Sequence, residues 1–218
     1  VARYGTAVTR RLKVQYRMHE AIMAFSALEF YAGELKADSS VREHRLCDLP
    51  GVKVNALTER PLHFLDTAGA GFEEQREPDG ESLLNPEEAR LVCRQVTQLL
   101  HAGIKPGDIA VIAPYSAQVR LLREQLNVAG LEIDSVDGFQ GREKEAVLIS
   151  LVRSNSEGKI GFLADVRRMN VALTRARRKL IVVGDSATLS NEPFYERLIR
   201  YFESVEAYHT VWEEPEAP

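Results

Sequence analysis

The chain has 218 residues, of which 44% are hydrophobic and 28% charged, a length and composition that fit one ordinary domain with a core of useful size. They argue against a disordered, collagen-like or coiled-coil chain. Because long apolar runs are absent, we expect no transmembrane helix, no secretory signal and no membrane partner. Net charge is 28 minus 32, or −4, which excludes a uniformly basic nucleic-acid binder.

Short runs rich in Val, Ile and Leu alternate with helical patterns, which predicts an α/β fold with a parallel sheet and crossover helices. Strands are expected at residues 12–14, 62–66, 109–113, 133–136, 146–151 and 180–184. Helices are expected at residues 19–30, 86–101, 116–129, 165–172 and 193–205. Because the strands are almost wholly apolar, helices should cover both faces of the sheet.

Local signals mark the helix ends and the connecting segments. Asn85 and Pro86 predict the start of the helix at 86–101, and Ser116 is the expected N-cap of the helix at 116–129. Residues 69–82 are rich in Gly and Glu and are interpreted as a mobile loop, and residues 206–218 as an acidic tail. Residues 32–60 are ambiguous, and the whole chain, 1–218, is taken as a single domain.

Charge and cysteine content narrow the function. Between residues 164 and 180, six bases stand against one acid, a local +5, which favours a focused anion site, although a solvated charged face explains it equally well. The two cysteines, Cys47 and Cys93, make neither a disulfide framework nor a four-ligand zinc site, so we expect no metal site. They favour an intracellular setting, cytoplasmic or nuclear.

Two blocks lie where a strand runs into a helix. In "QYRMHE", Arg17 can bind phosphate oxygens and Tyr16 can stack on a base, unless this is an ordinary junction with Tyr16 in the core. In "APYSAQ", Tyr115 and Gln118 can contact a nucleic-acid strand, unless Ser116 is simply a helix cap. In open α/β sheets, ligands bind at the carboxyl ends of the strands, so both blocks are candidate binding segments.

Two further blocks carry glycines and arginines. In "SVDGFQGREKE" the glycines allow a tight backbone turn and Glu143 can accept hydrogen bonds from ribose hydroxyls, although a turn with a solvated charge run is the plain alternative. In "DVRRMNVALTRARR" Arg175 can stabilise charge on a transferred phosphoryl group, the arginine-finger role; a solvated basic helix is the alternative. No G-x-x-x-x-G-K-[ST] motif occurs, so the chain has no P-loop of its own.

In order and spacing, the four blocks resemble the second RecA-like domain of superfamily 1B helicases, the branch that contains the nonsense-mediated-decay and immunoglobulin-mu-binding helicases. The strings "QYRMH", "VDGFQGREKEAVLIS", "LVRSN" and "GFLADVRRMNVALTRAR" carry this resemblance, from Leu12 to about Gly184. It implies a RecA-like, P-loop-NTPase-type sheet and an ATP-dependent helicase. The family's first RecA-like domain supplies the P-loop, so we expect a piece of a longer chain, an expectation that the start at Val1 favours.

The resemblance also implies roles for single residues. Arg17 and Arg175 would be catalytic and contact the γ-phosphate, and Tyr16, Glu143 and Gly141 would complete the ATP site, with Mg²⁺ held by the first domain. Single-stranded DNA or RNA would be contacted by Tyr115, Gln118, Ser135, Ser154 and Asn155, and Gln140 and Gly141 would link the two sites. The 2′-hydroxyl that separates RNA from DNA is not readable from these residues.

Two other classes of function stay open at this point. One is a non-catalytic nucleic-acid-binding or regulatory module that kept the RecA-like fold. The other is an interaction scaffold that uses the acidic segments. Arg17, Glu143 and Arg175 favour the helicase motor, because a pure binding module has no use for arginines that contact a γ-phosphate.

Overall fold

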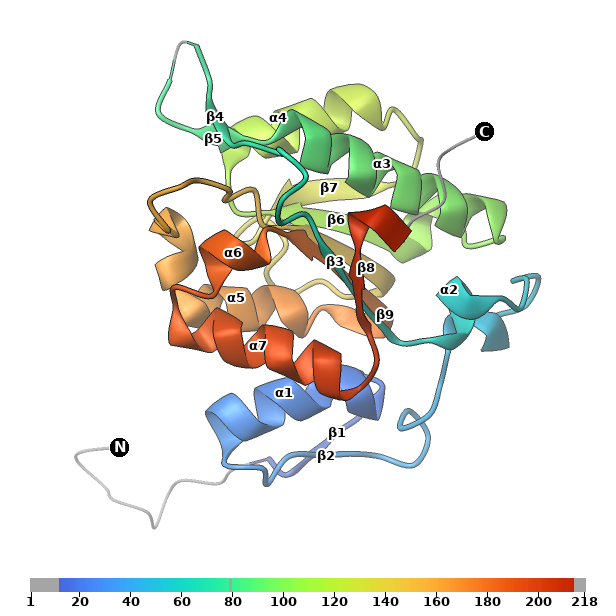
Figure 1. Cartoon of the computed structure of the whole chain (residues 1–218). Coiled ribbons are helices and arrows are strands. Elements are labelled where there is room, and N and C mark those ends of the chain that lie inside the picture. The colour runs from blue at the N-terminus through green and yellow to red at the C-terminus, as the bar shows by residue number, and fades with distance from the viewer. Residues whose placement is uncertain (1–11, 79, 214–218) are drawn as a thin grey trace.

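The computed structural model describes residues 12–78 and 80–213. Its centre is a six-stranded sheet in which all neighbouring strands are parallel, in the order β10-β3-β9-β8-β6-β7 (Figure 1). The strands are β3 (Leu62–Asp66), β6 (Ile109–Ala113), β7 (Glu132–Ser135), β8 (Lys144–Ser150), β9 (Ala176–Gly184) and β10 (Tyr208–Thr210). Two small sheets pair β1 (Val14–Gln15) with β2 (Lys36–Ala37), and β4 (Gln75–Arg76) with β5 (Leu83–Leu84).

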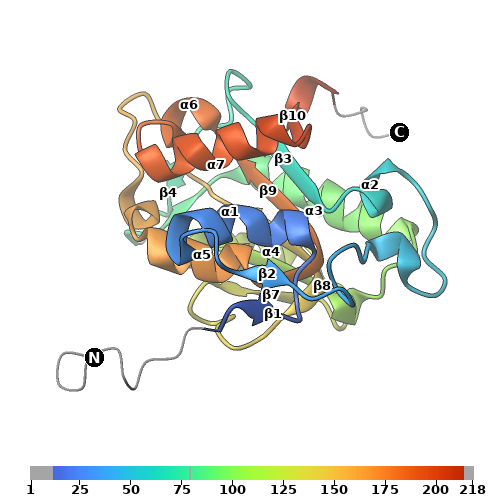
Figure 2. The ribbon, with the colours of Figure 1, turned by 90° about the horizontal axis from the view of Figure 1, so that it is seen from below.

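Helices cover both faces of the sheet, which confirms the predicted α/β fold. One face carries α3 (Pro86–His101) and α4 (Ser116–Gln125); the other carries α1 (Glu20–Tyr31), α5 (Val166–Leu173) and α7 (Pro193–Ser204), as Figure 1 and Figure 2 show. The short helices are α2 (Ala56–Glu59) and α6 (Ser186–Leu189). No helix in the described part of the chain is long and apolar enough to cross a bilayer.

The central strands build two cores because their side chains alternate between the faces of the sheet. In β9, Leu180 and Val182 join the core under α1, α5 and α7, whereas Ile181 and Val183 join the core under α3 and α4. All four side chains are buried. The apolar runs in the sequence therefore mark strands that are covered on both sides.

Helix α3 has the predicted bounds, and the two residues predicted to start it do so. The Asn85 side chain accepts a hydrogen bond from the amide of Glu88 at 3.0 Å, and Pro86 opens the helix. Strands β3 and β6 also have the predicted bounds, and the other boundaries shift by a few residues.

Two local predictions are wrong. The strand expected at 12–14 is β1, which covers Val14–Gln15 and pairs with β2 outside the main sheet. Ser116 is not a cap: Tyr115 holds the N-cap position without a side-chain hydrogen bond, and Ser116 is the first helical residue. A boundary also shifts: the same helix ends at Gln125 rather than 129, where Leu126 leaves helical geometry with φ −109° and ψ 66°.

The segments interpreted as a mobile loop and as an acidic tail each contain a strand. Within residues 69–82, Gln75–Arg76 forms β4 and pairs with β5; the mobility of this segment stays a prediction. Within the acidic tail, Tyr208–Thr210 forms β10 beside β3 at the edge of the main sheet, so the described part of the tail belongs to the fold. Residues 1–11, 79 and 214–218 lie outside the described residues.

Candidate functional site

Arg17, Glu143 and Arg175 come together at the amino ends of the central strands. Arg17 follows β1, Glu143 directly precedes β8 and Arg175 directly precedes β9. The guanidinium of Arg17 is ion-paired with the carboxylate of Glu143, and its Nη1 donates to the carbonyl oxygen of Thr174 at 3.2 Å. The fold thus joins residues that lie far apart in the sequence.

The Arg175 side chain is held by the main chain around it. Its Nε donates to the carbonyl oxygen of Val171 at 2.8 Å and its Nη1 to that of Arg142 at 3.2 Å. Burial lowers the pKa of Arg175, and the positive charge of Arg17 lowers it further. Because two guanidinium groups repel each other here, a bound anion such as a phosphate would be favoured by both.

Tyr16 and Gly141 lie beside this cluster in the sequence. Tyr16 is 67% exposed, so the interpretation that places it in the core is wrong, and its ring is open to stacking. Gly141 has a φ of +83°, a left-handed conformation that favours glycine, and a Cβ there would meet nothing within 4 Å. Position 141 therefore favours glycine because of its backbone conformation, and not because a side chain would lack space.

This placement corrects the expectation taken from open α/β sheets. The general rule puts ligands at the carboxyl ends of the strands, but Glu143 and Arg175 stand at the amino ends of β8 and β9. The candidate nucleic-acid residues are the ones that follow the rule, since Ser135 ends β7, and Tyr115 and Ser154 come after β6 and β8. The two groups lie at opposite ends of the sheet.

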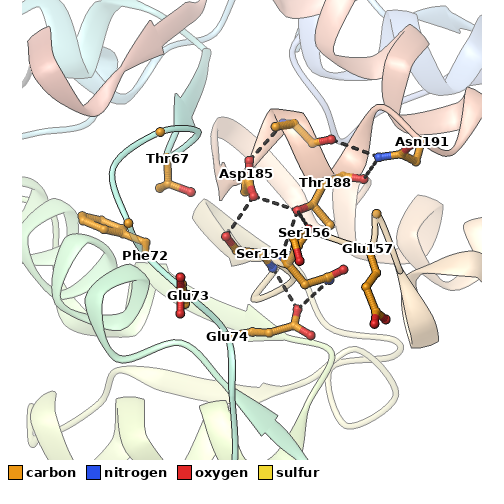
Figure 3. A pocket seen from close by; sticks show the side chains of 15 residues that line it. Thr67, Phe72, Glu73, Glu74, Ser154, Ser156, Glu157, Asp185, Thr188 and Asn191 are labelled. Atoms are coloured by element: carbon orange, nitrogen blue, oxygen red, sulfur yellow. Dashed lines mark hydrogen bonds between the residues drawn. The ribbon is translucent and has the colours of Figure 1, made fainter.

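A pocket of about 740 Å³ opens at the carboxyl ends of β3, β8 and β9 (Figure 3). Its lining residues belong to segments 67–74, 154–158 and 185–191. Among these described lining residues there is no Lys or Arg, and the charged ones are Glu73, Glu74, Glu157 and Asp185. The hydroxyl of Thr67 is buried at the pocket without a hydrogen-bond partner among the described residues. The pocket is thus rich in hydrogen-bond acceptors.

Ser154 and Asn155 both line this pocket. The hydroxyl of Ser154 donates to Asp185 at 2.8 Å, and the amide of Asn155 donates to the hydroxyl of Thr188 at 3.0 Å. Ser154 keeps its hydroxyl oxygen as an acceptor, and the Asn155 side-chain oxygen already accepts from the amide of Lys159 at 2.9 Å. Both residues are held firmly and present acceptor atoms.

Tyr115 and Ser135 are half-buried and take part in local hydrogen bonds. The Tyr115 hydroxyl accepts from the amide of Phe162 at 3.2 Å, and the two rings are 6.2 Å apart between centroids. The Ser135 hydroxyl accepts from the amide of Gly138 at 3.1 Å and so fixes the turn that follows β7. Neither hydrogen bond prevents Tyr115 or Ser135 from contacting a nucleic-acid strand.

Gln118 does not fit its predicted role, because its side chain is fully buried. Its Oε1 accepts from the amide of Asn85 at 2.8 Å, and its Nε2 donates to the hydroxyl of Ser150 at 2.9 Å. Gln118 therefore joins the starts of α3 and α4 to the end of β8 and does not reach the surface.

Sequence reasoning missed the pair formed by Glu74 and Arg153. The Arg153 guanidinium is almost fully buried and donates to the Glu74 carboxylate from Nε at 2.7 Å and from Nη2 at 3.0 Å. Hydrogen bonds to Glu74 and Tyr115 outweigh burial, which alone would lower the pKa of Arg153, and leave that pKa raised. Arg153 falls inside the string "LVRSN", but nothing local in the sequence links it to an acid 79 residues earlier.

Comparisons with known proteins agree with this layout. A family model described as an AAA domain matches residues 2–187. DNA-binding protein SMUBP-2 of Mus musculus is 52% identical over 202 residues, which cover 92% of this chain and 20% of that protein. The Regulator of nonsense transcripts 1 homolog of Drosophila melanogaster is 40% identical over 202 residues, which cover 88% of this chain and 16% of that protein.

The crystal structure of the C-terminal domain of a possible DNA helicase from Lactobacillus plantarum WCFS1 has the same fold. It aligns with a TM-score of 0.50 at 14% identity, covering 90% of this chain and 98% of that one. Fold, motifs and sequence matches define the class as a RecA-like domain of superfamily 1 helicases. The chain belongs to the AAA domain family, which confirms the resemblance. It spans about a fifth of the length of the first curated relatives it matches.

Proposed function

We propose that the chain is the second motor half of an ATP-dependent nucleic-acid helicase or translocase and is inactive on its own. The observation that carries this proposal is the cluster of Arg17, Glu143 and Arg175 at one end of the sheet. Arg17 pairs with the Glu143 carboxylate, and the charge of Arg175 interacts with both. Two neighbouring guanidinium groups beside a carboxylate suit a polyanionic ligand that also carries hydroxyl groups, which is the chemistry of a nucleoside triphosphate.

In the intact protein, ATP would bind between this cluster and the first RecA-like domain. Arg17 and Arg175 would donate to the γ-phosphate, Glu143 would accept from the ribose and Tyr16 would stack on the base. An arginine finger such as Arg175 contributes about 10³–10⁵ in rate by stabilising transition-state charge. Mg²⁺ would be held by the first domain and would neutralise phosphate charge there.

Single-stranded DNA or RNA would cross the opposite end of the sheet. Ser154, Asn155, Tyr115 and Ser135 supply polar and aromatic contacts there, and the 740 Å³ pocket provides room for part of a nucleotide. Because the described lining of the pocket is acidic, we expect it to contact sugars and bases, with the phosphates turned outward. An intracellular setting goes with this function and stays a prediction.

The test compares this chain with the longer helicase that contains it. The chain alone should show no ATPase activity above background, with or without single-stranded nucleic acid, and the longer protein should show strand-stimulated hydrolysis. Turnover by the isolated chain at helicase rates, or no strand stimulation in the longer protein, would contradict the proposal.

A further inference from the structure

The loop that follows β8 is held in an unfavourable backbone conformation. Val152 has a φ of +72°, a left-handed value that is strained for a β-branched residue. The next residues in the loop are Arg153, Ser154 and Asn155. The surrounding structure must therefore fix the loop that presents Ser154 and Asn155 to the pocket.

Two carboxylates fix this loop from opposite sides. Glu88 of α3 accepts from the hydroxyl of Ser150 at 2.6 Å and from the amide of Val152 at 2.9 Å. Glu74, which precedes β4, holds the other side. Its own amide also donates to the carbonyl oxygen of Ser154 at 3.1 Å, so side chain and main chain of Glu74 both contact the loop.

The Glu74 carboxylate receives four hydrogen bonds. Two come from the Arg153 guanidinium, one from the amide of Ser154 at 2.9 Å and one from Nδ2 of Asn155 at 3.1 Å. Arg153 in turn donates from Nη1 to the Tyr115 hydroxyl at 3.3 Å. One carboxylate thus connects three of the candidate strand-contacting residues, which Figure 3 shows in part.

The burial of this group makes it a rigid connection. The side chains of Arg153 and Glu74 are 7% and 15% exposed, and charge-assisted bonds of this kind hold geometry better than exposed pairs do. The neighbouring Glu73 lines the same pocket but is exposed and makes none of these bonds. The two adjacent acids therefore differ in burial and in contacts.

We propose that Glu74 is the positioning residue of the strand-binding surface. It fixes the loop of Ser154 and Asn155 and, through Arg153, the ring of Tyr115, in the arrangement that contacts single-stranded nucleic acid. This proposal rests on the proposed function. It assigns to segment 69–82 a part in nucleic-acid binding that its acidic composition alone would argue against.

Whether substitution of Glu74 weakens or tightens nucleic-acid binding distinguishes a positioning role from a purely electrostatic one. Removing a negative charge near a polyanion tightens binding, so an electrostatic role predicts tighter binding for both Glu73→Gln and Glu74→Gln. Positioning predicts weaker binding for Glu74→Gln alone, because the Gln side chain loses the charge that orients Arg153 and the loop.

The experiment titrates ¹⁵N-labelled chain 1–218 with a ten-nucleotide oligo-dT or oligo-U and follows amide shifts, which detects millimolar affinity. Glu74→Gln should weaken binding about tenfold, whereas Glu73→Gln, which only removes a negative charge beside the polyanion, should tighten it. In an Asn155→Ala background the loss caused by Glu74→Gln should shrink, since the two residues act together. Thermal unfolding of each variant shows whether it remains folded.

Tyr115→Phe provides a second, milder variant that keeps the ring and loses the hydroxyl bonded by Arg153, and weaker binding is expected. Binding of Glu74→Gln equal to that of the parent, or tighter, overturns the proposal and leaves the proposed function intact. If Glu74→Gln does not fold, unchanged binding by Tyr115→Phe overturns it. If a millimolar concentration of the oligonucleotide shifts no amide signal of residues 150–158 in the parent chain, both the proposed nucleic-acid contact and the positioning role of Glu74 are wrong.

Discussion

The guanidinium of Arg17 contacts the carboxylate of Glu143 in the free domain. The residues expected to hold the γ-phosphate and the ribose of one nucleotide therefore neutralise each other before the nucleotide arrives. The side chains of Arg17 and Glu143 are 35% and 38% exposed, and ion pairs this exposed contribute only about 0–1 kcal/mol. A triphosphate can therefore replace this contact at little cost.

Arg175→Ala, made in the helicase that contains this chain, should abolish strand-stimulated hydrolysis. The expected loss in kcat is about 10³-fold or more, because the transition state loses a charge-stabilising donor, while nucleotide affinity changes less. Steady-state ATPase kinetics and equilibrium nucleotide binding measure the two effects. Arg90→Ala is the matched control, since Arg90 pairs with Glu87 on the surface of α3. Equal activity of Arg175→Ala and the parent would exclude the finger role.

Glu143→Gln should remove discrimination between ATP and 2′,3′-dideoxy-ATP. The parent helicase is expected to bind ATP more tightly, because a carboxylate accepts hydrogen bonds from ribose hydroxyls that the analogue lacks. In the variant the two affinities should converge to within about threefold, since the charge-assisted contact is lost. Competition binding with both nucleotides measures this. Discrimination retained in full by the variant would assign the ribose to another residue.

Glu88→Gln should change stability in a pH-dependent way. Burial raises the pKa of Glu88 from its ordinary 4.5 to about 7 in the folded chain. The folded state thus binds this proton more tightly than the unfolded state does. The stability that protonated Glu88 contributes is present below pH about 4.5 and is lost as the pH rises through about 7.

Glutamine does not titrate, so its contribution to stability does not change with pH. From pH 4 to pH 8, the free energy of unfolding of Glu88→Gln should therefore rise by roughly 3 kcal/mol relative to that of the parent. Urea unfolding of both proteins at the two pH values gives this difference. The same stability difference at both pH values would show that the fold leaves the pKa of Glu88 at its unfolded value. Glu87→Gln, on the exposed side of α3, is the control and should show no such trend.

Gly161→Ala should destabilise the chain far more than Gly69→Ala. Both glycines have positive φ, +52° and +74°, so each alanine carries a backbone cost of about 1 kcal/mol. At Gly161 a Cβ would also lie 3.0 Å from the Tyr115 hydroxyl and in contact with the Arg153 guanidinium, whereas at Gly69 nothing lies within 4 Å. We expect roughly 3 kcal/mol at Gly161, measured by urea unfolding. Equal losses at the two sites would mean that Arg153 moves aside freely.

Local chemistry explains which parts of the fold were predictable. Asn85 and Pro86 act within one helical turn, so α3 was predicted with its bounds. The short strand β10 was missed because Tyr208–Thr210 carries no apolar run; its place depends on pairing with β3. Ser116 has the right chemistry for a cap, but the chain enters the helix one residue earlier.

In the candidate site, too, some residues could be predicted from the sequence and some contacts could not. The resemblance of the motif strings to a helicase family located Arg17, Glu143 and Arg175, and the fold brings these three residues together. Burial of Gln118 and the bond between Glu74 and Arg153 depend on side chains from distant segments. No local pattern encodes such contacts.

The connection from β7 to β8 runs the full length of the sheet without a helix. It leaves Ser135 at the carboxyl end and reaches Glu143 at the amino end, some 20 Å away along β8. Beside it runs α5, whose Arg168 pairs with Asp137. Arg175, which follows α5, donates to the carbonyl oxygen of Arg142 near the other end of the connection. One segment of the chain therefore reaches from the residues proposed to contact single-stranded nucleic acid to the residues proposed to contact ATP.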